Sequence, residues 1–179
     1  MSTPFVLSTE RLTLRRFVLD DAPFVIALVN EPGWLEFIGD KGVHTIEDAH
    51  RYLQAGPLRM YEQFGFGLYL IERKSDAVPI GMCGLIKRDT LEYVDIGFAL
   101  LASVAGQGFA YEAACAVVQL AKSLKLPRLL AITTPTNHAS QKLLRKLGLQ
   151  FEKEIRMGPE AEALHLFAIE LNAQSREKI

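Results

Sequence analysis

Cysteine and surplus charge are both scarce in this sequence, and each scarcity excludes a class of protein. The only cysteines, Cys83 and Cys115, stand in apolar surroundings outside any CxxC pair, which argues against a disulfide framework and a zinc site. The chain has 20 Lys and Arg residues against 21 Asp and Glu residues, a formal net charge of −1. Without a general positive field to attract nucleic acid or an anionic membrane, any polyanionic ligand must be held by a local feature of the fold.

Long hydrophobic runs are also missing. The longest uncharged stretch, residues 96–111, contains two closely spaced glycines and Gln107 and is shorter than the roughly 18 residues that a membrane span requires. The N-terminus has neither the basic region nor the apolar core of an export signal. The chain has 179 residues, of which 49% are hydrophobic and 23% charged, and this predicts one cytoplasmic domain over 1–179 with its core at about 8–172.

Hydrophobic periodicity predicts a mixed sheet covered by helices. Alternating or short apolar runs bounded by turn residues indicate strands at 10–17, 66–72, 79–86, 91–101, 128–134, 149–156 and 162–171. Helical spacing and capping signals indicate helices at 19–30, from Thr45 to Gly56–Pro57, within 103–125 and after Asn137. The glycine-rich residues 32–42 are expected to form a loop. Short turns make the three strands of 66–101 an antiparallel meander, and the whole order predicts an α/β (α+β) fold with helices on both faces.

A glycine-rich turn at Ala105–Ala110 is the sharpest local feature. It lies between a predicted strand and the N-terminus of an alanine-faced helix, where free backbone N–H groups and the helix dipole favour a pyrophosphate. A Walker A loop is excluded because there is no lysine between Ser103 and Gln119, and a dinucleotide-binding turn is disfavoured because Tyr111 replaces its third glycine. Two readings stay open: the pyrophosphate of an acyl-CoA, and a tight turn that needs glycine only for its geometry.

Two longer segments resemble one enzyme family. The chain resembles the GNAT N-acetyltransferases at KRDTLEYVDIGFALLASVAGQGFAYEA and TTPTNHASQKLLRKLGLQFEKE, and it is similar to their RimJ/RimL-like branch at STERLTLRRFVLDDA. The family's (Gln/Arg)-x-x-Gly-x-(Gly/Ala) loop matches at Gly108 and Ala110, and its Asn-x-x-Ser/Ala…Gly segment matches at Asn137, Ser140 and Gly148. The resemblance implies a GNAT-type, mainly antiparallel sheet with a splayed central strand pair. It also implies transfer of an acetyl group from acetyl-CoA to a primary amine by direct attack.

The resemblance further implies which residues bind the cofactor. The strand at 96–101 would bind the acyl group and the pantetheine through backbone N–H groups as it diverges from 128–134. Asn137 would bind the pantetheine amide, although asparagine is also a common helix N-cap. The implied cofactor-binding residues are Phe98, Ala99, Leu100, Ala105, Gly106, Gln107, Gly108, Phe109, Ala110, Asn137 and Ser140.

Catalysis requires a base for the ammonium group and a proton source for the CoA sulfur. Asp95, just before the diverging strand, and Glu92, three residues earlier, are the candidate bases, and either also suits a solvated strand residue. Leu144 stands where many family members carry a tyrosine acid, so Ser140 is the candidate proton donor. Ala105 likewise replaces the Gln or Arg of the family loop.

The expected function is acetyl-CoA-dependent N-acetylation of a protein N-terminal α-amine, as in the family branch, or of a small-molecule amine. A non-catalytic acyl-CoA-binding module on the same fold is the alternative from another class, and the replacements at Ala105 and Leu144 keep it open. No nucleic acid, membrane or metal partner is expected. The protein is expected to be a monomer or a homodimer.

Overall fold

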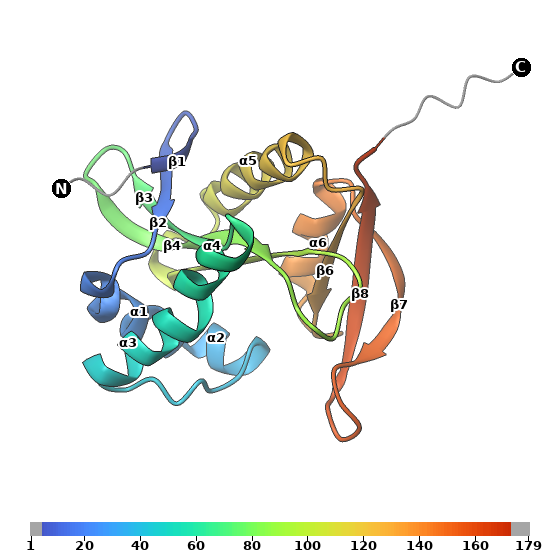
Figure 1. Ribbon diagram of the computed structural model, residues 1–179, viewed down its shortest axis with the longest axis horizontal. Helices are drawn as coiled ribbons and strands as arrows, with labels where there is room; N and C mark the ends of the chain where they lie inside the picture. Colours follow the sequence, from blue (N-terminus) through green and yellow to red (C-terminus); the bar gives the residue numbers. More distant parts are fainter. Residues whose placement is uncertain (1–4, 173–179) are drawn as a thin grey trace, which may run out of the picture.

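An eight-stranded sheet organises the computed structural model, which describes residues 5–172 (Figure 1). The strands lie in the order β1-β2-β3-β4-β5-β6-β8-β7. Their bounds are Phe5–Ser8 (β1), Leu12–Arg16 (β2), Leu68–Arg73 (β3), Val78–Ile86 (β4), Asp95–Leu100 (β5), Arg128–Thr133 (β6), Gln150–Arg156 (β7) and Ala163–Glu170 (β8). All neighbouring strands are antiparallel except β5 and β6, which are parallel. The expected mixed, mainly antiparallel sheet is confirmed.

Helices cover both faces of this sheet, α5 and α6 on one face and α1, α2 and α3 on the other (Figure 1). Their bounds are Ala22–Val29 (α1), Pro32–Phe37 (α2), Ile46–Leu53 (α3), Arg59–Phe64 (α4), Phe109–Ser123 (α5) and His138–Lys146 (α6), with 3-10 turns at Leu19–Asp21 and Ala102–Val104. Side chains alternate along β3 and β4, so Tyr69 and Cys83 pack beneath α5 while Leu70 and Met82 pack on the α1–α3 face. None of the helices within residues 5–172 combines the length and apolar composition that crossing a bilayer demands.

The central strands β5 and β6 separate almost as soon as they meet. Only one residue pair, Asp95 and Leu130, is in register, and Leu130 N–H donates to Val94 O (3.0 Å). On its other edge β5 pairs with β4 along its whole length. The antiparallel meander of β3, β4 and β5 and the splayed central pair therefore both match the sequence prediction.

Three local features differ from the sequence prediction. β1 precedes the expected first strand and pairs with it as a hairpin. The stretch at 32–42 contains the short helix α2, because Pro32 suits the first turn of a helix, where its missing N–H is not needed. Gly56–Pro57 is expected to break or kink its helix, and the helix is not broken there, since a π-helical turn at Gln54–Leu58 carries the chain from α3 into α4 around the proline.

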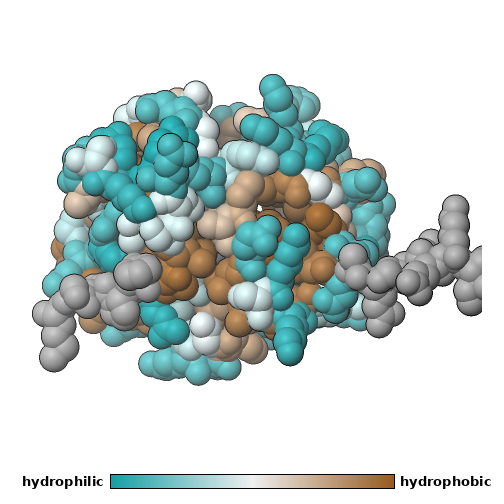
Figure 2. Space-filling model, turned by 90° about the horizontal axis from the view of Figure 1, so that it is seen from above, coloured by the Kyte–Doolittle hydropathy of each residue, from teal (hydrophilic) through white to brown (hydrophobic). Residues whose placement is uncertain are grey.

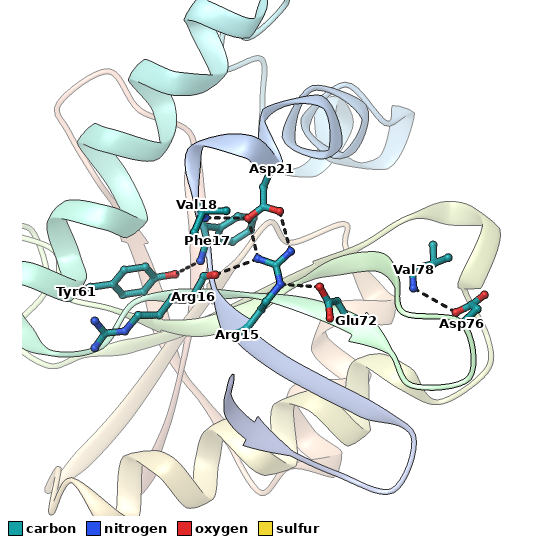
Figure 3. Close-up of polar contacts among 9 residues, drawn as sticks. All are labelled: Arg15, Arg16, Phe17, Val18, Asp21, Tyr61, Glu72, Asp76 and Val78. Atoms are coloured by element: carbon teal, nitrogen blue, oxygen red, sulfur yellow. Dashed lines mark hydrogen bonds and ion pairs between the residues drawn. The ribbon is translucent and has the colours of Figure 1, made fainter. Parts of the chain in front are cut away.

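Arg15 of β2 ties the N-terminal helices to the sheet (Figure 3). Its guanidinium donates to both carboxylate oxygens of Asp21, just before α1, at 2.8 and 2.9 Å, and to Glu72 of β3 at 2.6 Å. Beside it, the hydroxyl of Tyr61 in α4 accepts a hydrogen bond from Phe17 N–H (3.1 Å). These contacts fix the path of the chain from the sheet to the α1–α3 face.

Gly84 of β4 lies against the backbone of the preceding strand. A Cβ atom at this position would lie 2.0 Å from Gly67 O, so the two backbones would have to move apart. We expect Gly84→Ala to lower the free energy of unfolding by about 3 kcal/mol, a fall in Tm of about 6–12 °C for a domain of this size. Gly33→Ala is the control, because a Cβ there meets nothing within 4 Å. Thermal unfolding followed by circular dichroism compares the two, and equal Tm values would contradict the close approach.

Candidate functional site

A cavity of about 600 Å³ lies where β5 and β6 diverge. Its walls come from both faces of the sheet: Ser140 and Leu144 of α6 line it on the α5–α6 side, and Trp34 of α2 and Met82 of β4 line it on the α1–α3 side. Seen from the α5–α6 side, apolar side chains gather in the middle of the molecule, where the surface is hollowed (Figure 2). The cavity thus passes through the split sheet, so ligands from opposite faces can meet in it.

β5 offers backbone donors to this cavity. Leu101 N–H, just beyond the strand, donates to Ile80 O of β4 (2.9 Å). Because N–H groups alternate in direction along a strand, Ala99 N–H also faces β4, whereas the N–H groups of Phe98 and Leu100 face the gap. In the described part of the chain these two groups have no strand partner, because β6 has already diverged. They can therefore receive a carbonyl oxygen.

Asp95 stands at the point where the strands separate. Its side chain is 1% exposed, and its Oδ1 accepts a hydrogen bond from Arg88 Nε (2.9 Å). Its Oδ2 has no hydrogen-bond partner among residues 5–172. Burial raises the pKa of Asp95 to about 6, although the positive charges of Arg88 and Lys87 act to lower it. Asp95 is therefore ionised at neutral pH yet takes up a proton readily, as a general base must.

Two more buried polar atoms on cavity-lining residues lack a hydrogen-bond partner within the described chain: Trp34 Nε1 and Thr134 Oγ1. With Asp95 Oδ2 they are the unsatisfied buried side-chain atoms of residues 5–172. Each such group costs about 1–3 kcal/mol when it has no partner. Because all three belong to residues around one cavity, they indicate a place for a polar ligand rather than scattered packing faults.

The glycine-rich loop Ala105–Ala110 joins β5 to the N-terminus of α5. Gly106 and Gly108 have φ angles of 75° and 81°, which glycine adopts without strain. Within the described residues, the backbone N–H groups of 106–111 have no hydrogen-bond partner. A run of free N–H groups at the start of a 15-residue helix is an arrangement that favours an anion.

Asn137 and Ser140 begin α6 and line the cavity. Asn137 Oδ1 accepts a hydrogen bond from Ser140 N–H (3.1 Å), so asparagine caps the helix. Gln141 Nε2 donates to Pro135 O (2.9 Å) and holds the turn before the helix in place. Leu144, one turn beyond Ser140, is 1% exposed and is part of the cavity wall.

The structure brings five of the thirteen residues that the sequence indicates into the cavity wall. Asp95, Phe98, Ala99, Asn137 and Ser140 all line the cavity. Leu100 and the loop 105–110 are not part of this wall, and the loop follows β5 after the 3-10 turn at Ala102–Val104. Glu92 is exposed in the connection between β4 and β5 and does not line the cavity.

Sequence reasoning missed six polar residues of the cavity wall: Trp34, Lys41, Tyr52, Arg88, Thr133 and Thr134. Trp34 is the only tryptophan of the chain, and it lies in a stretch that was expected to form a loop. A large aromatic residue in such a loop could have indicated a functional position. Arg88 gave none, because a charged residue is ordinary in a turn. Burial raises the pKa of Tyr52 to about 12, with Arg88 acting against it, so its hydroxyl stays protonated.

Known proteins share both sequence and fold with this chain. The family model described as an acetyltransferase (GNAT) domain matches residues 11–150. The uncharacterized N-acetyltransferase p20 of Bacillus licheniformis is 31% identical over 152 residues, which cover 84% of this chain and 85% of that protein. The GNAT-family acetyltransferase from Bacillus anthracis superposes with a TM-score of 0.76 at 24% identity, over 94% of this chain and 99% of that one.

A further solved structure contains the cofactor. RimL, the ribosomal L7/L12 α-N-protein acetyltransferase in complex with coenzyme A, superposes with a TM-score of 0.77 at 17% identity, over 93% of this chain and 98% of that one. At such identity the similarity concerns the fold. The family match spans most of the chain, and it includes the diverging strands, the glycine-rich loop and Asp95. This chain therefore belongs to the GNAT acetyltransferase family.

Proposed function

We propose that this protein transfers an acetyl group from acetyl-CoA to a primary amine by direct attack, and that the acceptor is the α-amine of a protein N-terminus. The observation that carries the proposal is Asp95, a buried carboxylate with one unpartnered oxygen, on the wall of a cavity that passes through the sheet. The α-N-protein activity named for RimL, which shares the fold, supports the choice of acceptor.

The chain offers backbone donors at two places to acetyl-CoA, which supplies the acyl group as a thioester. The free N–H groups of 106–110 at the start of α5 suit the pyrophosphate. The N–H groups of Phe98 and Leu100 suit the pantetheine amide and the thioester carbonyl. Asn137, with its side-chain amide at the cavity wall, suits the remaining pantetheine amide.

In the reaction we propose, Asp95 accepts a proton from the ammonium group of the acceptor. The amine nitrogen then attacks the thioester carbonyl carbon, and the β5 N–H groups stabilise the oxygen as it becomes negative. The new C–N bond forms and the C–S bond breaks. Ser140 gives its hydroxyl proton to the departing thiolate and recovers one from the amide nitrogen, so the products are an amide and a free thiol.

A non-catalytic acyl-CoA-binding module would need the loop and the β5 donors, but it would have no use for Asp95. Raising the pKa of a carboxyl from 3.8 to about 6 destabilises the folded protein at neutral pH, by roughly 3 kcal/mol. Retention of so unfavourable a buried charge favours an enzyme.

The pH dependence of the reaction tests Asp95. We expect kcat/KM to rise with pH through an acidic limb near pH 6, because the base must be ionised and its pKa is about 6. Asp95→Asn should remove this limb and lower kcat/KM by about 100-fold or more. Arg88→Gln should move the limb to higher pH, because the guanidinium acts to lower the pKa of Asp95. Release of free thiol from acetyl-CoA measures the rates, and loss of the limb in Glu92→Gln instead would transfer the role of base to Glu92.

Substitution of Gly108 tests the phosphate loop. We expect Gly108→Val to weaken CoA binding at least about tenfold, because φ of 81° is unfavourable for valine and the loop backbone must change to relieve it. Gly65→Val is the matched control: its φ is 74°, a Cβ there meets nothing within 4 Å, and it lies outside the cavity wall. Calorimetric titration with CoA gives both dissociation constants. Equal affinities in the two variants would refute the assignment of the loop.

A further inference from the structure

The cavity wall on the α1–α3 face differs from the cofactor side in its chemistry. Apolar side chains make up most of it, among them Phe37 of α2, Ile38, and Met157 and Leu164 near the β7–β8 hairpin. The charged residues that line the cavity are Lys41, Arg88 and Asp95. Two cations therefore face one carboxylate, and an acceptor with several positive charges is disfavoured by Coulomb repulsion.

Hydrogen-bond donors without partners line the same cavity as the carboxylate. Arg88 uses Nε on Asp95 Oδ1, and its two Nη groups have no hydrogen-bond partner in the part of the chain that the structure describes. Trp34, which is 7% exposed, carries the unpartnered Nε1–H. The free carboxylate oxygen Asp95 Oδ2 and the free donors of Arg88 and Trp34 thus belong to residues that line the same, mainly apolar space. A ligand with an ammonium group next to an oxygen atom is complementary to these groups, because the ammonium group donates to the carboxylate and the oxygen accepts from the N–H donors.

We propose, on the basis of the proposed function, that this wall binds an apolar α-aminoacyl group and that Trp34 determines the specificity for it. The amine lies at Asp95, the neighbouring carbonyl or carboxylate oxygen accepts hydrogen bonds from Trp34 Nε1 and Arg88, and an apolar side chain packs on Phe37 and Met157. A peptide N-terminus and a free apolar amino acid both present this chemistry. Polyamines and aminoglycosides do not.

Equilibrium binding to the CoA-saturated protein tests the inference without turnover. Leucinamide, leucine, isoamylamine and spermidine are titrated by calorimetry at pH 7, where each amine is mainly protonated. Isoamylamine is leucinamide without its carboxamide, so the difference in affinity between the two measures the contribution of the carboxamide group, which carries the oxygen. We expect leucinamide to bind at least about tenfold more tightly than isoamylamine and spermidine to show no saturable binding. Tighter binding of leucine than of leucinamide identifies a free amino acid as the acceptor, and the reverse identifies a peptide N-terminus.

Trp34→Phe keeps an aromatic ring and removes the N–H together with part of the indole ring system. We expect it to weaken leucinamide binding about tenfold more than isoamylamine binding, because both ligands feel the smaller ring but only leucinamide loses a hydrogen bond. Leu35→Ala, on the exposed side of the same helix, is the control. Equal affinities for leucinamide and isoamylamine, or an unchanged preference in Trp34→Phe, would overturn the inference. Thiol release from acetyl-CoA is recorded in parallel, because its absence despite selective leucinamide binding refutes the proposed function and leaves this inference standing.

A second and independent observation concerns the glycine-rich loop. Arg11, between β1 and β2, donates from Nη1 to Gln107 O (2.9 Å) and from Nε to Glu112 Oε2 (2.7 Å). Its backbone N–H donates to Glu112 Oε1 (2.8 Å), and its guanidinium lies 4.3 Å from the centre of the Phe109 ring. Arg11 therefore binds the loop and the first turn of α5 together. The contacts join residues about a hundred positions apart in the sequence.

We infer that Arg11 is a positioning residue that holds the loop in its anion-binding conformation. Ala105, within the loop, has no polar side chain that could do this. This also rests on the proposed function. The helix provides the N–H groups, and the guanidinium bound to Gln107 O keeps the peptide planes of the loop oriented. Loss of these bonds should weaken cofactor binding and leave the chemistry at Asp95 intact.

The ratio of kinetic constants tests this role. We expect Arg11→Met to raise KM for acetyl-CoA about tenfold with kcat within about twofold, and Arg11→Lys to recover only part of the loss because lysine lacks the planar fork. Arg73→Met is the matched control, since it breaks a comparable Arg–Asp pair in the β3–β4 turn. Calorimetry with CoA gives the same comparison without turnover. An unchanged affinity in Arg11→Met, or an equal loss in Arg73→Met, would overturn the inference.

Discussion

Because β5 and β6 pair only at Asp95 and Leu130, the sheet is continuous at that point and open beyond it, and this opening creates the site. Each strand keeps one complete ladder, β5 with β4 and β6 with β8, so neither loses its place in the sheet. Because there is no further ladder between β5 and β6, N–H groups of β5 have no partners. The same absence opens a gap that connects the two faces of the sheet. The same divergence places a buried carboxylate at the end of the gap.

Several polar groups of the site are buried in fixed positions and have no hydrogen-bond partner. Asp95 Oδ2, Trp34 Nε1 and Thr134 Oγ1 are buried without partners in the described chain, although most buried polar groups in proteins are paired. The net charge of −1 gives no general attraction for a polyanion, so any such ligand depends on a local feature of the fold. Backbone N–H groups at the start of α5 supply the local positive potential, without a basic patch.

Much of the fold follows from local sequence patterns. The short turns between β3, β4 and β5 dictate antiparallel pairing, and the glycines at 106 and 108 mark a loop that only positive φ angles allow. The motif residues Asn137 and Ser140 and the strand residues Asp95 and Phe98 could be assigned to one site because a family pattern connects them. Trp34 and Arg88 could not, since they come from a short helix and a turn whose positions depend on tertiary packing. The sequence likewise could not decide whether Asp95 or Glu92 lines the cavity. The decision depends on which side chain is buried, and a spacing of three residues does not reveal that.

The strand order has a consequence for the order in which the molecule can form during synthesis. Strands β1 to β5 lie side by side in the order of the sequence, so each can join the growing sheet edge as it leaves the ribosome. β6 pairs with β5 at one residue pair only and forms its full ladder with β8. β8 lies between β6 and β7 in the sheet and ends at Glu170. The N-terminal half can thus be folded while the nascent chain still has no site. The wall that β6 contributes to the cavity therefore depends on a strand that is synthesised after every other strand of the sheet.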